Sequence, residues 1–383
     1  MNASKNKIIL AVAGAGKTTE LAKQALAKAR QTDKKILLIT YTINGVNSLL
    51  NTIKQNNLGV INHNIEIMSW YKFLLNECIL PYQRDFNINI DIKGILFTNE
   101  VPKKNNLPVY TFKNKTDMAR YVTLSKKAYS DTMSDFLIQI NKINNGLFVK
   151  RLEDVYSDIF IDEVQDLNGE DLEIIEELLK SNINICLIGD HRQSTFNTHS
   201  SQKYKRYKGS NIKEFFKIWE NSGLVNIEEK LECHRSIQDI CSFADMLYPK
   251  ESKAKSLNNI KTELDGVFLI KQEDIIDFNN MLHPFVLRWD KRKNTCGLNA
   301  TNFGDSKALT KERTLIFPTK PMIDFYLDNK TIDSDVSKYY VALTRAKQSI
   351  CIVVDKFPQR DFLEDYNFRE INLKKFVLTN KED

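Results

Sequence analysis

Residues 8–19, with the sequence IILAVAGAGKTT, constrain the fold of this chain more than any other segment. A short apolar strand leads into a glycine-containing turn, and a helix-like stretch follows over residues 20–30. Backbone N–H groups of such a turn, and of the helix N-terminus after it, can bind phosphate groups. The alternative is a glycine-rich turn without a ligand, which the strand before it and the helix after it disfavour. We therefore expect a phosphate-binding loop, although Ala11 stands where the pattern G-x-x-x-x-G-K-[ST] begins with glycine.

A second apolar segment, residues 159–161, ends in two carboxylates, Asp162 and Glu163. Acidic residues often do no more than end a strand, but their combination with a phosphate loop is a stronger signal than either feature alone. Asp162 stands where a carboxylate would hold Mg²⁺ together with the Thr18 hydroxyl, and Glu163 where a general base would activate a water molecule. The residues that we expect to bind the nucleotide phosphates are Ala13, Gly14, Ala15, Gly16, Lys17, Thr18 and Thr19.

Composition excludes several other classes of protein. The six cysteines are scattered without a C-x-x-C spacing, which argues against a zinc site or a disulfide framework. A formal charge of +6 is compatible with a nucleic-acid partner. No apolar stretch approaches the length that spans a membrane, and the N-terminal residues lack the pattern of a signal peptide. We expect a cytoplasmic protein without a membrane partner.

Apolar runs alternate with helical patterns from the N-terminus to Leu80, with strands expected at 35–40 and 65–69 and a helix at 46–53. Such alternation predicts a parallel sheet with crossover helices. The alternation stops near residue 84, a helical run is expected over 117–143, and strands and helices resume near residue 158. Further strands are expected at 266–270, 285–289, 314–317 and 349–354. We predict a first lobe formed by residues 1–83 and 151–225, a small, mostly helical insertion at 84–150, and a second lobe at 226–383.

Five more segments follow in a definite order. They are ITYTIN at 39–44, LIGDHRQS at 187–194, LECHRS at 231–236, GDSKALT at 304–310 and YVALTRAK at 340–347. Together with the phosphate loop and DEVQD at 162–166, this series resembles that of the superfamily 1 DNA helicases of the UvrD/Rep type. The resemblance implies an α/β fold of two RecA-like P-loop NTPase lobes with parallel sheets and ATP in the cleft between them. It also implies DNA-stimulated ATP hydrolysis that depends on Mg²⁺, with movement along DNA from 3′ to 5′.

The resemblance also implies roles for residues beyond the loop and the carboxylates. Gln193 would sense the γ-phosphate, and Arg235 and Arg345 would act as arginine fingers from the second lobe. His234 and Thr310 match the positions that contact the base and the ribose, but the family has an aromatic residue and a glutamate there.

Residues that match the DNA-contacting motifs of the family form a separate set. Trp70 lies at a strand end, where a core position is an equally good interpretation. Aromatic and basic residues that alternate also suit single strands, because rings stack on bases and cations follow phosphates. The expected DNA-binding residues are Thr40, Thr42, Asn44, Trp70, Tyr204, Lys205, Tyr207 and Trp289.

The segment between Arg235 and Asp305 is short, whereas full-length relatives carry a large accessory domain at this place. We therefore expect a reduced helicase, and two functions stay open. One is a helicase or translocase acting on single-stranded or tailed duplex DNA. The other is an ATPase subunit that senses single-stranded DNA for a partner nuclease, by analogy with the small UvrD-like proteins of Gabija-type antiphage systems.

Overall fold

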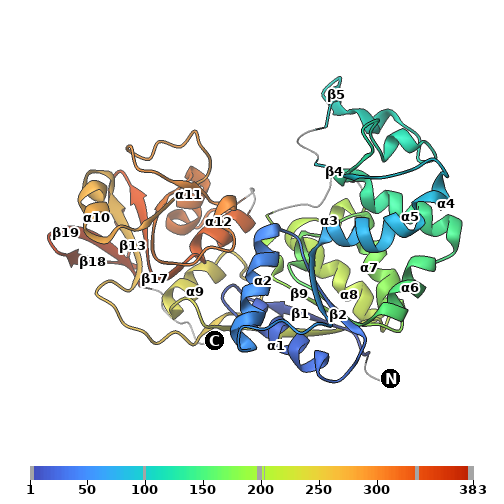
Figure 1. Cartoon of the computed structure of the whole chain (residues 1–383). Helices are drawn as coiled ribbons and strands as arrows, with labels where there is room; N and C mark the ends of the chain where they lie inside the picture. Colours follow the sequence, from blue (N-terminus) through green and yellow to red (C-terminus); the bar gives the residue numbers. More distant parts are fainter. Residues whose placement is uncertain (1–3, 98–100, 196–200, 202, 333–335, 378–383) are drawn as a thin grey trace. The chain divides into compact units, whose positions relative to one another are not determined.

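The computed structural model describes residues 4–97, 101–195, 201, 203–332 and 336–377, and their contacts divide the chain into two compact units (Figure 1). The first unit comprises Met1–Leu10, Lys17–His191 and Phe196–Glu229. The second comprises Ala11–Gly16, Arg192–Thr195 and Lys230–Asp383. Two short segments that the sequence assigns to the first lobe, Ala11–Gly16 and Arg192–Thr195, thus belong by their contacts to the second unit.

The first unit is built on a six-stranded sheet with the order β10-β1-β9-β8-β2-β3. Every neighbouring pair from β1 to β3 is parallel. One strand, β9, separates β1, which precedes the phosphate loop, from β8, which precedes the two carboxylates. This arrangement confirms the predicted parallel sheet with crossover helices. The strands are β1 (Lys7–Ala11), β2 (Lys35–Thr40), β3 (Ile65–Ser69), β8 (Tyr156–Ile161), β9 (Asn184–Gly189) and β10 (Asn226–Lys230).

The central strands are apolar over most of their length because helices cover both faces of the sheet. In β2, the residues from Ile36 to Ile39 are fully buried. The expected strands at 35–40 and 65–69 are confirmed at both ends. The expected helix at 46–53 is confirmed within a longer one. The main helices of this unit outside residues 84–150 are α1 (Lys17–Ala29), α2 (Ile43–Asn56), the short α3 (Trp70–Lys72), α7 (Glu170–Lys180) and α8 (Ile212–Asn221).

The described residues of the segment 84–150 do not form the single long helical run that the sequence suggests. The expected helix at 117–143 becomes α-helical only at Met133, because the preceding segment folds back on it. The Asp135 carboxylate accepts hydrogen bonds from Lys115 at 2.9 Å and from Arg120 at 3.2 Å, which hold that segment in place. The elements here are α4 (Gln83–Phe86), β4 (Gly94–Leu96), β5 (Lys103–Lys104), β6 (Leu107–Pro108), β7 (Lys127–Tyr129), α5 (Met133–Asn144) and α6 (Leu147–Val155).

The second unit is built on a seven-stranded sheet with the order β15-β14-β16-β17-β13-β19-β18. The five strands from β15 to β13 are parallel, and a hairpin of β18 and β19 adds an antiparallel edge. The four strands expected from the sequence are confirmed, and the hairpin was not predicted. The strands are β13 (Gly266–Lys271), β14 (Phe285–Arg288), β15 (Thr301–Asn302), β16 (Lys311–Phe317), β17 (Ala346–Val354), β18 (Leu363–Phe368) and β19 (Ile371–Phe376).

Helices cover both faces of this sheet, which gives it two cores. Alternate residues of β13 enter different clusters: Val267 and Leu269 enter one, and Phe268 and Ile270 enter the other. The first cluster includes residues of α9 (Gln238–Asp245), α11 (Lys320–Asp328) and α12 (Val336–Leu343). The second includes residues of α10 (Ile275–Leu282). None of the described helices is long and apolar enough to cross a membrane.

Candidate nucleotide site and strand-binding residues

The turn after β1 has the backbone conformation of a phosphate-binding loop. Gly14 and Gly16 have φ angles of +79° and +76°, a region that glycine adopts readily. The Ala15 N–H donates to the Val12 carbonyl at 3.2 Å, which closes the turn. Helix α1 begins directly afterwards at Lys17, so Lys17, Thr18 and Thr19 stand in its first turn. The unpaired N–H groups of a helix N-terminus favour phosphate oxygens there.

Gly14 packs tightly against the chain around Arg235. A Cβ atom on Gly14 would lie 2.6 Å from Arg235 Cβ and 2.8 Å from Cys233 Sγ, so no other residue fits without a shift. The His234 N–H donates to the Gly14 carbonyl at 3.0 Å. The main chain of the turn is therefore fixed to the segment that carries Arg235.

Two thiols lie beside this contact. Hydrogen bonds from the Cys241 thiol and from the N–H groups of Ser236 and Arg235 lower the pKa of Cys233 below its ordinary value, against the effect of burial. The same thiol pair and burial raise the pKa of Cys241. Nothing local in the sequence indicates that Cys233 lies against Gly14 of the phosphate loop.

The two candidate arginine fingers meet at Thr344. The Arg235 guanidinium donates to the Thr344 carbonyl at 2.8 Å, and Arg345 Nη2 donates to the Thr344 hydroxyl at 3.0 Å. The same Arg345 nitrogen donates to the Gln193 side-chain oxygen at 3.0 Å. Contacts within the second unit therefore link Gly14, Arg235, Arg345 and Gln193, which come from four distant segments of the sequence.

The remaining two residues expected near the nucleotide lie next to this cluster. His234 is exposed and precedes Arg235, while its main chain contacts Gly14. Thr310 is exposed between Leu309 and Lys311. Arg345 donates to the Leu309 carbonyl at 3.1 Å and accepts from the Lys311 N–H at 2.9 Å. Both positions stay candidates for contacts to the base and the ribose.

The carboxylate pair lies in the first unit, at the end of β8. The Asp162 N–H donates to the Ile39 carbonyl at 2.8 Å, which continues the ladder between β8 and β2. The Glu163 N–H donates to Asp162 Oδ1 at 2.9 Å. Because β1, β9, β8 and β2 are parallel neighbours, their carboxyl ends line one edge of the sheet. The Asp162 carboxylate and the Thr18 hydroxyl supply oxygen ligands of the kind that Mg²⁺ prefers.

Arg192, which sequence analysis did not single out, anchors the segment that carries Gln193. Its guanidinium donates to Asp245 Oδ1 at 2.7 Å and to the Ser252 carbonyl at 2.7 Å, and both charged side chains are only 3% exposed. The Tyr248 hydroxyl donates to the Arg192 carbonyl at 3.2 Å. Nothing local in the sequence indicates this pairing, because its members are 53 residues apart.

The structure corrects two of the expected DNA contacts. Trp70 is 1% exposed, and its indole N–H donates to Asp171 Oδ1 at 3.0 Å, so the core interpretation is right and no base can stack on it. Thr40 is 2% exposed and is covered by Gly45, where an added Cβ would lie 2.5 Å from Thr40 Oγ1.

The other expected DNA contacts are at least partly accessible and remain predictions. Thr42 and Asn44 are exposed at the start of α2, where Thr42 caps the helix by accepting the Gly45 N–H at 3.0 Å. Lys205 is exposed. Tyr204 and Tyr207 pack against Phe215. In the second unit, Trp289 packs on Tyr339, and the Lys338 ammonium lies 4.9 Å from the centre of its ring.

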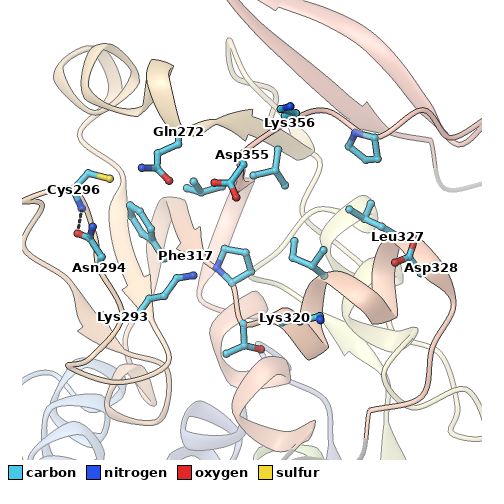
Figure 2. Close-up of a pocket in the computed structure, with 16 residues that line it drawn as sticks. Gln272, Lys293, Asn294, Cys296, Phe317, Lys320, Leu327, Asp328, Asp355 and Lys356 are labelled. Atoms are coloured by element: carbon cyan, nitrogen blue, oxygen red, sulfur yellow. Dashed lines mark hydrogen bonds between the residues drawn. The ribbon is translucent and has the colours of Figure 1, made fainter.

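A pocket of about 550 Å³ lies at the carboxyl ends of β13, β17 and β16 in the second unit. Figure 2 shows Gln272, Lys293 and Asp355 directed into the space around Phe317. After β13 the chain continues into α10 on one face of the sheet, and after β16 it continues into α11 on the other face. Ligands of parallel sheets bind where successive connections go to opposite faces.

The charged side chains of this pocket favour an anionic ligand. Three lysines line it, namely Lys293, Lys320 and Lys356. Of its two carboxylates, Asp328 is paired with Arg360 at 2.6 Å. The pocket therefore suits a phosphate group better than a cation.

Comparison with known proteins gives a match to one family model. Residues 97–203 match the UvrD/REP helicase N-terminal domain, a stretch that includes the carboxylate pair and Gln193. Comparison with curated protein sequences finds no match. The solved structures that resemble the chain include an arterivirus nonstructural protein 10, a helicase in complex with DNA, with a TM-score of 0.46 and 14% identity over 92% of this chain. The PRRSV helicase matches with a TM-score of 0.41 and 15% identity over 97% of this chain. The chain spans about three fifths of the length of these helicases, 61% and 59% respectively.

Proposed function

We propose that this chain is an ATP-dependent DNA helicase or translocase that moves 3′ to 5′ on single-stranded or tailed duplex DNA. One observation carries the proposal. The phosphate-loop turn, Arg235, Arg345 and Gln193 are joined by direct contacts within one unit, although they come from four distant segments. A surface arginine with only a structural role would have no reason to contact the phosphate-loop turn or the buried side chain of Gln193.

The chemistry divides among the residues as follows. The phosphates are bound by the turn from Ala13 to Gly16 and by the Lys17 side chain. This binding positions the γ-phosphate for attack. Glu163 accepts a proton from the attacking water. Arg235 and Arg345 neutralise charge that develops on the transferred group, a role worth ~10³–10⁵-fold in rate.

Magnesium, held by Thr18 and Asp162, would supply charge neutralisation at the phosphate oxygens. Gln193 accepts a hydrogen bond from Arg345, so its position depends on the arginine that acts on the γ-phosphate. It can therefore report hydrolysis to the segment that Arg192 anchors on Asp245.

Strand binding rests on exposed residues of both units. We propose that phosphates of a single strand contact Lys293, Lys320 and Lys356 in the second unit and that Thr42 and Asn44 contact it in the first. Each phosphate contact releases counterions, so log affinity should fall with log salt by about 0.7 per contact. Lys293→Ala should reduce that slope, and Lys250→Ala, which changes an exposed lysine outside the pocket, should leave it unchanged.

A second candidate function is an ATPase subunit that senses single-stranded DNA for a partner nuclease in antiphage defence. The observation that favours it is the short chain between Arg235 and Asp305. Its residues build α9, β13, α10 and β14 of the second unit itself. Within the part of the chain that the structure describes, this segment therefore holds no separate accessory domain to grip duplex DNA.

A strand-displacement assay with a 3′-tailed duplex tests unwinding directly. ATP-dependent displacement by the pure protein, absent in Lys17→Ala, supports the helicase. DNA-stimulated ATP hydrolysis without displacement is expected of the sensing subunit and also of a translocase that does not unwind DNA. Absence of any DNA-stimulated hydrolysis rejects both.

A further inference from the structure

Gln165 makes two hydrogen bonds that join the general base to a neighbouring strand end. It stands on the turn Val164–Asp166 that follows the carboxylate pair, and it is 2% exposed. Its side-chain nitrogen donates to the Glu163 carboxylate. Its side-chain oxygen accepts the Asp190 N–H at 3.0 Å. The amide thus spans from the end of β8 to the end of β9.

Gly189, the last residue of β9, makes room for this amide. A Cβ atom there would lie 2.2 Å from the Gln165 side-chain oxygen and 3.0 Å from Val164 Cγ1. Its φ angle is not in the left-handed region, so its conformation does not require glycine. Space for the Gln165 amide is therefore the reason why a larger residue is unfavourable there.

Glu163 needs such support because its backbone is in the left-handed region, with φ +57° and ψ +37°. A non-glycine residue is sterically unfavourable there and persists when its surroundings hold it. The Glu163 N–H donates to Asp162 at 2.9 Å, and its carbonyl accepts the Asp166 N–H at 3.0 Å. These bonds fix the backbone, and Gln165 bonds the carboxylate itself.

We propose that Gln165 is a positioning residue that holds the Glu163 carboxylate in register with the Asp190–Gln193 segment. The inference rests on the proposed function, because it assumes that Glu163 is the base. Asp190 begins the segment that ends in Gln193, whose side chain accepts a hydrogen bond from Arg345. Through Gln165, the Glu163 carboxylate is joined to Asp190, the first residue of that segment. Gln165 assists Glu163 without touching the nucleotide, so its loss should lower kcat rather than nucleotide affinity.

The first test compares Gln165→Ala with a matched control. Gln24→Ala removes a glutamine that donates to a carboxylate in the same unit, Glu20 at 2.7 Å, but far from the carboxylate pair in sequence. Gln165→Ala should lower the DNA-stimulated kcat by ~10–100-fold, the scale of a misplaced catalytic group, with KM for ATP within about threefold of wild type. Gln24→Ala should leave both constants within about twofold.

A double-variant cycle excludes a merely structural effect. Gly189→Ala should lower kcat by at least ~10-fold in the wild-type background, because the new methyl group displaces the amide, but by less than about threefold in the Gln165→Ala background. Gln165→Met keeps the approximate size while it removes both hydrogen bonds, and it serves if Gln165→Ala does not fold. Wild-type kcat in Gln165→Ala or Gln165→Met would overturn the assignment. So would a Gly189→Ala effect on kcat that is equally large in the wild-type and Gln165→Ala backgrounds. Lack of hydrolysis in the wild-type protein would instead reject the proposed function, and this inference with it.

Discussion

Replacing Gly14 by alanine tests whether the phosphate-loop turn is fixed to the chain around Arg235. A left-handed alanine costs about 1–2 kcal/mol relative to glycine. The new Cβ would also lie 2.6 Å from Arg235 Cβ and 2.8 Å from Cys233 Sγ, and overpacking of this kind costs about 1–3 kcal/mol more. The expected total is about 2–5 kcal/mol.

Gly16→Ala is the matched control. Its φ of +76° is nearly the same, but no atom lies within 4 Å of a Cβ there, so only the backbone cost of about 1–2 kcal/mol applies. Calorimetric unfolding of the nucleotide-free proteins should show a further fall in Tm of at least about 2 °C for Gly14→Ala compared with Gly16→Ala. Equal shifts in the two variants would refute the contact between the turn and Arg235.

Four further predictions concern other residues of the chain. Arg235→Ala and Arg345→Ala should each lower kcat by ~10²-fold or more with a smaller loss of ATP affinity in equilibrium binding, and a loss of affinity alone would assign that arginine to ground-state binding. Trp70→Phe should lower the free energy of unfolding by about 1–3 kcal/mol, because Asp171 loses the indole N–H, but should leave single-strand affinity unchanged. Trp289→Ala should weaken single-strand binding, measured for both tryptophan variants by fluorescence titration with labelled DNA, by about 1–3 kcal/mol if a base stacks there. Burial would raise the pKa of Asp135, but hydrogen bonds and charge from Lys115 and Arg120 lower it below its ordinary value. A lowered folded-state pKa contributes stability above the unfolded value of about 4. Asp135→Asn should therefore be less stable than wild type at neutral pH, and the gap in Tm should close as pH falls through the lowered pKa.

Local patterns in the sequence were enough for most of the parallel strands, though not for the hairpin of β18 and β19. They were also enough for the chain order of the candidate site residues. The strand at 35–40 could be predicted because Ile36 to Ile39 form an unbroken apolar run, as in buried parallel strands. The carboxylates could be placed because they directly follow such a run.

Long-range contacts determine the features of the fold and of the site that local sequence patterns did not predict. The helix expected over 117–143 is shorter because Asp135 binds two cations that precede it, and neither pairing has a local signature. The turn Ala11–Gly16 follows the first strand but packs on the distant segment around Arg235. Gln165 gave no signal either, because its partner at Asp190 becomes a neighbour only when β8 and β9 pair.

Steady-state ATP hydrolysis by Glu163→Gln, with and without single-stranded DNA, tests whether the chain is a DNA-stimulated ATPase with Glu163 as its general base. The wild-type protein should hydrolyse ATP faster when single-stranded DNA is present. Glu163→Gln should still bind ATP, because the phosphate loop is intact, but should hydrolyse it at least ~10²-fold more slowly, the scale of a lost general base. Hydrolysis by Glu163→Gln at the wild-type rate, or a wild-type protein that binds ATP without hydrolysing it in the presence of DNA, would contradict the account.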